Sequence, residues 1–192
     1  MRQEKKVLAC VDKSDYATHV ADYAAWAAAR LSAPIELLHV IDRHPEIAAD
    51  VDRSGSIGVD AQENLLEQLS QEEGERSKVI REQGRVFLNQ LRTRCEIHTG
   101  LQIDTRQRYG QLLATLKDQE SSVGMYVLGR RGESASHTRR DLGRHVEAIC
   151  RQIRRPIMTV TDDFKVPKSV LVAYDGGRMT RQGIELLASS LN

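Results

Sequence analysis

The sequence predicts an α/β fold, a doubly wound five-stranded parallel sheet of the Rossmann-like or flavodoxin-like kind, and two observations lead to it. First, apolar runs alternate with helical patterns along residues 1–161, which is typical of a parallel sheet with helices on both faces. Second, the apolar runs are nearly continuous, as expected for strands buried on both faces. Right-handed crossovers leave a few doubly wound topologies, of which we expect the strand order 3-2-1-4-5.

The individual elements follow from apolar periodicity and from residues that start or stop helices. Continuous apolar runs predict strands at residues 6–11, 35–41, 96–103, 123–129 and 156–161. Apolar stripes at helical spacing predict helices at residues 16–31, 60–92, 109–117 and 143–153. Ser14 or Asp15 can cap the first helix. Residues 42–59 are rich in Pro, Gly, Asp and Ser, so we expect a loop or lid there.

An internal repeat divides the chain. Residues 5–12, KKVLACVD, resemble residues 168–175, KSVLVAYD, at an offset of 163 residues, and a helical pattern follows each. We therefore expect one domain at 1–161, a linker at 162–167, and the first strand and helix of an incomplete second repeat at 168–192. Because one strand and one helix cannot bury a core, that second repeat either docks on the first domain or a partner chain, or belongs to a longer tandem protein.

Composition excludes several classes of protein. The net charge of +1 gives no general attraction to nucleic acid or membrane, and 4% aromatic residues are too few for a surface that stacks bases. No segment is long and apolar enough for membrane insertion, and the N-terminus does not resemble a signal peptide. Three scattered cysteines predict reduced thiols in a cytoplasmic protein. The scattered histidines show no metal-ligand spacing, so we expect no metal site.

A glycine-rich turn between the fourth strand and its helix carries the main functional signal. Gly129, Gly132 and Gly143 allow backbone N–H groups to approach an anion, and the helix after Gly143 presents its positive end. Residues 129–155 hold eight arginines against three acidic residues, and arginine binds phosphate bidentately. The sequence therefore predicts a phosphate-binding loop. The alternative is a strand–helix turn without a ligand, in which the glycines serve the backbone geometry and the arginines are solvated.

Several segments resemble the universal stress protein family. VLACVDKSDYATHVADYAAWAA resembles that family's first strand and helix, LLHVID its second strand, and YVLGRRGE with LGRHVEAICRQIRRPIMTV its fourth strand, loop, helix and fifth strand. The similarity covers residues 5–161, resumes at 168–190, and is closest to tandem-domain members. It implies a non-catalytic stress-response protein that binds ATP, with Mg²⁺, or another adenine nucleotide. It also implies homodimerisation through the strand at 156–161.

The resemblance implies a set of binding residues. The family motif is Gly, two residues, Gly, nine residues, then Gly and Ser or Thr. Gly129 and Gly132 fit it, but ten residues separate Gly132 from Gly143, and Arg144-His145 stands where tandem relatives carry Ser-Asn. Arg144 either contacts phosphate in place of the hydroxyl or fills the pocket. The remaining candidates beside the loop are Arg130, His145, Asp12 and Val40.

Each of these candidate residues has either a ligand-binding role or a purely structural one. Asp12, at the end of the first strand, can accept a hydrogen bond from ribose or adenine, or cap the next helix. Val40 can line an adenine pocket or serve as core, and Arg106 and Arg108 fit a solvated loop better than an anion contact. No catalytic base is identifiable, so we expect no enzyme beyond weak ATP hydrolysis. The alternative function is an interaction module without nucleotide, acting through dimerisation, a protein partner or a transporter.

Overall fold

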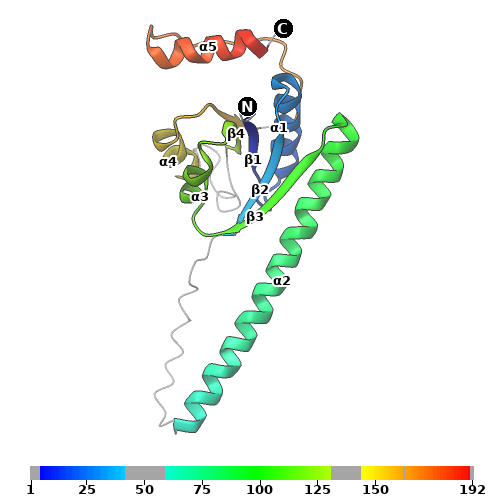
Figure 1. The fold of residues 1–192 in the computed structure, drawn as a ribbon, viewed down its shortest axis with the longest axis vertical. Helices are drawn as coiled ribbons and strands as arrows, with labels where there is room; N and C mark the ends of the chain where they lie inside the picture. The colour runs from blue at the N-terminus through cyan, green and yellow to red at the C-terminus, as the bar shows by residue number, and fades with distance from the viewer. Residues whose placement is uncertain (1–4, 42–58, 131–143, 162, 191–192) are drawn as a thin grey trace.

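The computed structural model describes residues 5–41, 59–130, 144–161 and 163–190. Five strands form one sheet, and their bounds are β1 (Lys6–Cys10), β2 (Ile35–Ile41), β3 (Ile103–Tyr109), β4 (Val123–Gly129) and β5 (Ile157–Val160). The helices are α1 (Ala17–Leu31), α2 (Val59–Thr99), α3 (Leu112–Gln119), α4 (Arg144–Gln152) and α5 (Arg178–Ser190). Every neighbouring pair of strands is parallel and the order is β3-β2-β1-β4-β5, which confirms the predicted fold class. Figure 1 shows β3, β2, β1 and β4 of this sheet.

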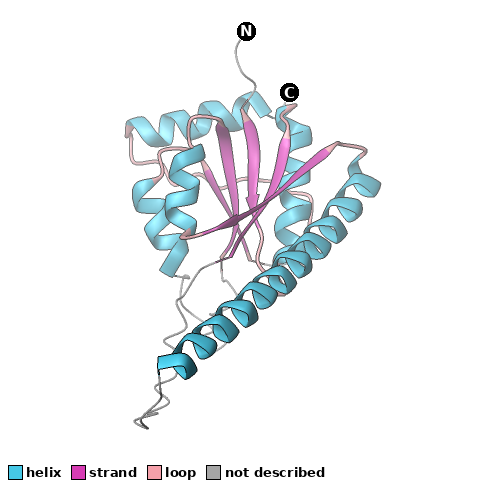
Figure 2. Ribbon diagram, turned by 60° about the horizontal axis from the view of Figure 1, so that its bottom comes forward, coloured by secondary structure: helices cyan, strands magenta, loops and turns pink. Residues whose placement is uncertain are grey.

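Two apolar cores lie on opposite faces of the sheet, because successive strand side chains point to opposite faces. Val7 and Ala9 of β1 pack with α1 and α2, whereas Leu8 packs with α3 and α4. Figure 2 shows the helices on both sides of the strands. The helix that follows β1 therefore covers one face and the helix that follows β4 covers the other. Neighbouring strands whose helices leave on opposite faces define a switch point in the sheet.

Helix α1 packs closely on the sheet because its buried face consists largely of small residues. Its buried positions are Ala17, Val20, Ala21, Ala24, Ala25, Ala27 and Ala28. The predicted cap was wrong: the helix begins after Tyr16, and no side chain caps it. Instead the Ser14 carbonyl accepts a hydrogen bond from the Ala17 N–H at 3.1 Å.

The third strand was predicted in the wrong place, at 96–103. The segment up to Thr99 continues α2, and Ile97, read from the sequence as a strand residue, is 76% exposed. Gly100 then ends the helix: its φ is +68° and its N–H donates to the Glu96 carbonyl at 2.8 Å. The strand follows at Ile103–Tyr109, where buried or half-buried residues alternate with exposed ones. Arg106 and Arg108 therefore lie in an edge strand, not in the loop that their charge suggested.

Helix α2 extends far beyond the sheet, as Figure 1 shows. Its 41 residues correspond to about 62 Å at 1.5 Å per residue. Its C-terminal part packs on the sheet through buried Leu88, Leu91 and Cys95. Val79 and Val86, two apolar positions of the helix predicted at 60–92, are exposed. The expected lid at 42–59 falls outside the described residues, apart from Val59.

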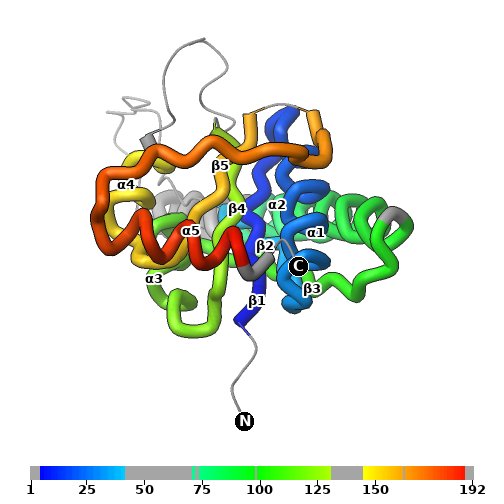
Figure 3. Tube along the Cα trace, turned by 90° about the horizontal axis from the view of Figure 1, so that it is seen from above, coloured from blue at the N-terminus to red at the C-terminus, as the bar shows by residue number. Residues whose placement is uncertain are grey.

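Residues 168–175 form no strand in the structure. They run from the linker to α5, which lies at the opposite end of the molecule from the projecting end of α2 (Figure 1). Seen from above, α5 crosses in front of β5 (Figure 3). The predicted second repeat is thus a helix preceded by an extended apolar segment outside the sheet.

Candidate functional site

Strands β2, β1 and β4 lie side by side at the switch point, and β2 continues three residues beyond the partner of Cys10. The register pairs Cys10 of β1 with Leu38 of β2 on one side and with Leu128 of β4 on the other. Because the strands are parallel, the residues two positions further along each chain also lie at one edge. Those residues are Val40, Asp12 and Arg130, all predicted from the sequence as site residues. The fold therefore gathers an apolar, an acidic and a basic residue where ligands of such sheets bind.

Asp12 shapes the turn that leaves β1. Its Oδ1 accepts a hydrogen bond from the Ser14 N–H at 3.1 Å and a short one from the Ser14 hydroxyl. A carboxylate that accepts the N–H two residues ahead forms an Asx turn, which fixes the chain direction locally. Asp12 does not cap α1, whose first residue is Ala17.

Val40 and Cys10 border the same edge from the strands beneath it. Both are half-buried and pack against the core that α3 and α4 cover. Burial, followed by the nearby Asp12 and Glu36 carboxylates, raises the pKa of the Cys10 thiol far above its ordinary value. Cys10 is therefore a neutral, apolar wall at neutral pH rather than a nucleophile. His39 is buried on the other face, with Nδ1 2.9 Å from the Val11 carbonyl, as expected of a core histidine.

The loop predicted to bind phosphate lies only partly within the described residues. Gly129 ends β4, and the Arg130 N–H donates to the Val160 carbonyl at 2.7 Å. Arg130 is exposed. Gly132 and Gly143 lie outside the described residues. Arg144 is the first residue of α4, and His145 follows it with its ring exposed.

The arginine-rich segment divides between the two ends of α4. Arg151 pairs with Glu147 at 2.7 Å within the helix. Arg155 Nε donates to the Glu120 carbonyl at 3.1 Å, and the Arg154 N–H donates to the Glu120 carboxylate at 2.7 Å. These three arginines lie toward or beyond the C-terminal end of α4, away from the strand ends. Of the arginines predicted for the phosphate site, Arg151, Arg154 and Arg155 are therefore not at the strand ends, and Arg130 is, among the described residues.

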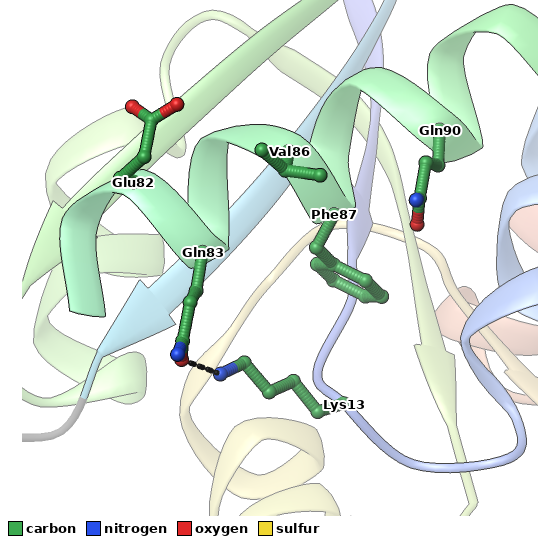
Figure 4. Close-up of a pocket in the computed structure, with 6 residues that line it drawn as sticks. All are labelled: Lys13, Glu82, Gln83, Val86, Phe87 and Gln90. Atoms are coloured by element: carbon green, nitrogen blue, oxygen red, sulfur yellow. Dashed lines mark hydrogen bonds between the residues drawn. The ribbon is translucent and has the colours of Figure 1, made fainter. Parts of the chain in front are cut away.

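A neighbouring pocket was not predicted from the sequence. It has a volume of about 360 Å³, opens widely to solvent, and is lined by Lys13, Glu82, Gln83, Val86, Phe87 and Gln90 (Figure 4). Lys13 follows Asp12 directly, and its Nζ donates to the Gln83 Oε1 at 3.2 Å. Sequence periodicity places Phe87 in α2 but cannot indicate that α2 passes beside the end of β1, because that contact is tertiary.

Two kinds of feature are absent from residues 5–41, 59–130, 144–161 and 163–190. No group of three or more His, Cys, Asp or Glu side chains there is arranged to hold a metal ion. No helix in these ranges has the length and apolar character to cross a membrane. The three cysteines, all within them, are free thiols.

Comparison with known proteins finds relatives in sequence and in structure. Universal stress protein Slr1230 of Synechocystis sp. is 32% identical over 188 residues, which are 97% of this chain. This chain spans 65% of the length of that relative. The structure of hypothetical protein MJ0577 matches with a TM-score of 0.59 at 16% identity, over 85% of this chain and 99% of that one. A universal stress protein from Archaeoglobus fulgidus in complex with dAMP matches with a TM-score of 0.51 at 15% identity, over 82% and 98%.

The structural matches are below 25% identity and establish the fold. Membership rests on the sequence comparisons. The universal stress protein family matches residues 4–161, which span the whole sheet and the helices around it. With the Synechocystis relative at 32% identity, this match shows that the chain belongs to the universal stress protein family.

Proposed function

We propose that this protein binds an adenine nucleotide, ATP with Mg²⁺ foremost, at the edge where β1 and β4 end. The observation that carries the proposal is the convergence of Val40, Asp12 and Arg130 from three neighbouring strands at the switch point. A family member in complex with dAMP supports an adenine nucleotide as the ligand. We propose further that the protein acts through this binding as a non-catalytic stress-response regulator.

Each residue has a distinct part in this proposal. The Asp12 carboxylate accepts a hydrogen bond from the ribose or adenine, and Val40 packs against the base. Backbone N–H groups at Gly129, Gly132 and Gly143 approach the phosphates.

The charged residues of the loop complete the proposed site. The Arg130 guanidinium, exposed at the end of β4, binds phosphate oxygens. Arg144 and His145 begin α4, whose N-terminal N–H groups attract anions. Mg²⁺ would bind through the phosphates, because the described residues include no carboxylate cluster that holds it. We also propose a cytoplasmic location, which the free thiols support.

Calorimetric titration with Mg-ATP tests the proposal. We expect micromolar binding, weakened at least about tenfold by Asp12→Ala, or about 1.4 kcal/mol. Gly132→Val, which blocks close backbone approach, should abolish binding. Arg154→Ala is the matched control, since Arg154 lies beyond the far end of α4 and should leave the affinity unchanged. Absence of binding by the native chain would overturn the proposal.

The alternative is an interaction module without nucleotide. The observation that favours it is the position of β5, an edge strand of four residues with β4 as its one partner in the sheet. Its outer edge offers backbone groups for pairing with a second copy. In this case the native chain fails to bind Mg-ATP, Arg144→Ser restores binding by clearing the crevice, and light scattering gives the mass of a homodimer.

A further inference from the structure

Arg108 lies beside the proposed nucleotide site, on an edge strand of the sheet. The register pairs Arg108 of β3 with Val40 of β2, the residue proposed to pack against the base. Paired residues of neighbouring parallel strands lie about 4.8 Å apart and point their side chains to the same face. Since β3 comes next to β2 in the order β3-β2-β1-β4-β5, Arg108 is one strand away from Val40, on the side opposite to the loop that follows β4.

The neighbours of Arg108 along β3 show which face its side chain occupies. The Arg106 guanidinium lies 3.4 Å from the carboxylate of Glu36, a buried residue of β2. The Tyr109 hydroxyl donates to the Ser77 carbonyl of α2 at 3.5 Å, on the other face of the sheet. Because side chains alternate between the two faces along a strand, Arg108 shares a face with Arg106 and points away from α2.

This face of β3 is open to solvent. Asp104, Arg106 and Arg108 are all exposed on it, whereas the residues between them are half-buried on the face toward α2. Helices α3 and α4 cover an apolar core with strand residues from β1, β2, β4 and β5, and among the described residues that core includes none from β3. The Arg108 side chain therefore extends from an uncovered part of the sheet, next to the half-buried Val40.

The two arginines of β3 differ in their partners. Arg106 adds a second cation to the ion pair between Lys6 and Glu36, whose charged atoms are 2.9 Å apart. Within the described part of the chain, no carboxylate lies at ion-pair distance from Arg108. Arg106 thus compensates a buried charge, whereas Arg108 presents its charge to solvent nearer the carboxyl edge of the sheet. Arg108 is therefore the arginine of β3 that a ligand at this edge can engage.

We propose that Arg108 is a specificity-determining residue of the nucleotide site, and that its guanidinium packs on the purine ring that Val40 supports. This inference rests on the function proposed above. A planar guanidinium stacks on aromatic rings and is attracted by their faces. The second fused ring of a purine reaches from Val40 toward β3, whereas the single ring of a pyrimidine covers Val40 alone. Arg130, three strand spacings or about 14 Å away, serves the phosphates, so the two arginines engage opposite ends of the nucleotide.

Calorimetric titration with Mg-ATP and Mg-UTP tests this inference, because the two nucleotides share ribose and phosphates and differ in the base. We expect the native chain to bind Mg-ATP at least about tenfold more tightly than Mg-UTP. Arg108→Ala should weaken Mg-ATP binding about threefold to tenfold and leave Mg-UTP binding unchanged. Arg130→Ala, at the phosphate end, should weaken both nucleotides by the same factor. Arg106→Ala is the matched control on the same strand and face, and should change neither affinity.

The other outcomes overturn the inference. Equal Mg-ATP affinity of the native chain and Arg108→Ala would exclude the contact with the base and leave the proposed nucleotide site intact. A loss of the same size for Mg-ATP and Mg-UTP would assign Arg108 to the phosphates instead. If the native chain binds neither nucleotide, the proposed function and this inference fail together. Because Arg108 is exposed, Arg108→Ala should keep the native melting temperature, which separates a lost contact from a loss of folding.

Discussion

The chain contains two similar units, residues 5–31 (the first unit) and residues 168–190 (the second unit). They share a sequence pattern, an Asx turn and a following helix, yet differ in the strand. The segment Val7–Val11 lies in the middle of the sheet with neighbours on both sides. The equivalent segment Val170–Tyr174, 163 residues later, has a similar apolar sequence but lies outside the sheet and is exposed. The turn forms in both units because its hydrogen bonds join residues close in sequence. The strand forms in one only, because a strand is stabilised by neighbours distant in sequence.

This difference also separates what the two units can do. Asp12 follows β1, which lies between β2 and β4, the strands that carry Val40 and precede Arg130. Asp175 makes the equivalent turn without strands on either side. An Asx turn alone does not make a ligand site. Only the first unit can therefore contribute to the nucleotide site proposed for this chain.

The largest expected effect comes from truncating the matched leucines. Leu8→Ala removes a fully buried side chain and should lower the free energy of unfolding by about 2–5 kcal/mol. Leu171→Ala, at the equivalent position, should change it by less than about 0.5 kcal/mol, because the side chain contacts mainly solvent. Urea denaturation followed by circular dichroism measures both. Equal destabilisation by the two variants would show that the second unit is part of the folded core.

A smaller effect is expected on the reaction rates of two thiols at equivalent positions of the two units. Burial raises the pKa of the Cys10 thiol, so little thiolate forms and the group should react slowly with Ellman's reagent. Ala173→Cys places a thiol at the equivalent exposed position of the second unit, where we expect reaction at least about 100-fold faster.

The labelling experiment needs a background of Cys150→Ser, because Cys150 is exposed. Cys95 serves as an internal control: burial raises the pKa of its thiol to about 12, so it should also react slowly. Rapid labelling of Cys10 in the native protein would mean that β1 opens to solvent. It would contradict the conclusion that the strand is buried in the first unit and exposed in the second.

The sequence predicted the fold well in segments with a clear apolar pattern. The strands rich in Val, Ile and Leu were found near their observed positions. The third strand was misplaced because β3 is an edge strand, whose exposed face carries Asp104, Arg106 and Arg108. Its hydrophobic alternation is weak, and the preceding Ile97 looked more strand-like. The helix stop at Gly100 is the signal that could have corrected the assignment.

The candidate site was predictable in part for the same reason. Strand ends can be read from sequence, and the predicted order placed β1 beside β4, so Asp12 and Gly129 were expected at one edge. The pocket at Lys13 was not predictable, because it depends on where the long α2 crosses that edge. The distribution of arginines was also misread. Their density in sequence concealed that Arg151, Arg154 and Arg155 belong to the far end of α4.

The smallest expected effect concerns the turn of the second unit and its dependence on pH. Hydrogen bonds from the Thr180 hydroxyl and then from the Gly177 N–H lower the pKa of the Asp175 carboxyl. A lowered pKa in the folded state means that the turn is stabilised above the ordinary value of about 3.9. That stabilisation is lost as the pH falls through the lowered value.

The amide resonance of Gly177 should therefore titrate with a midpoint below 3.9 when followed by NMR from pH 7 to pH 2. Asp175→Asn is the matched control, because its side-chain oxygen still accepts the Gly177 N–H but does not titrate. It should keep the native shift of Gly177 and remove its pH dependence. A random-coil shift of Gly177 in the native chain at pH 7 would contradict the conclusion that the same turn forms in both units. The turn, like the strand before it, would then depend on a partner.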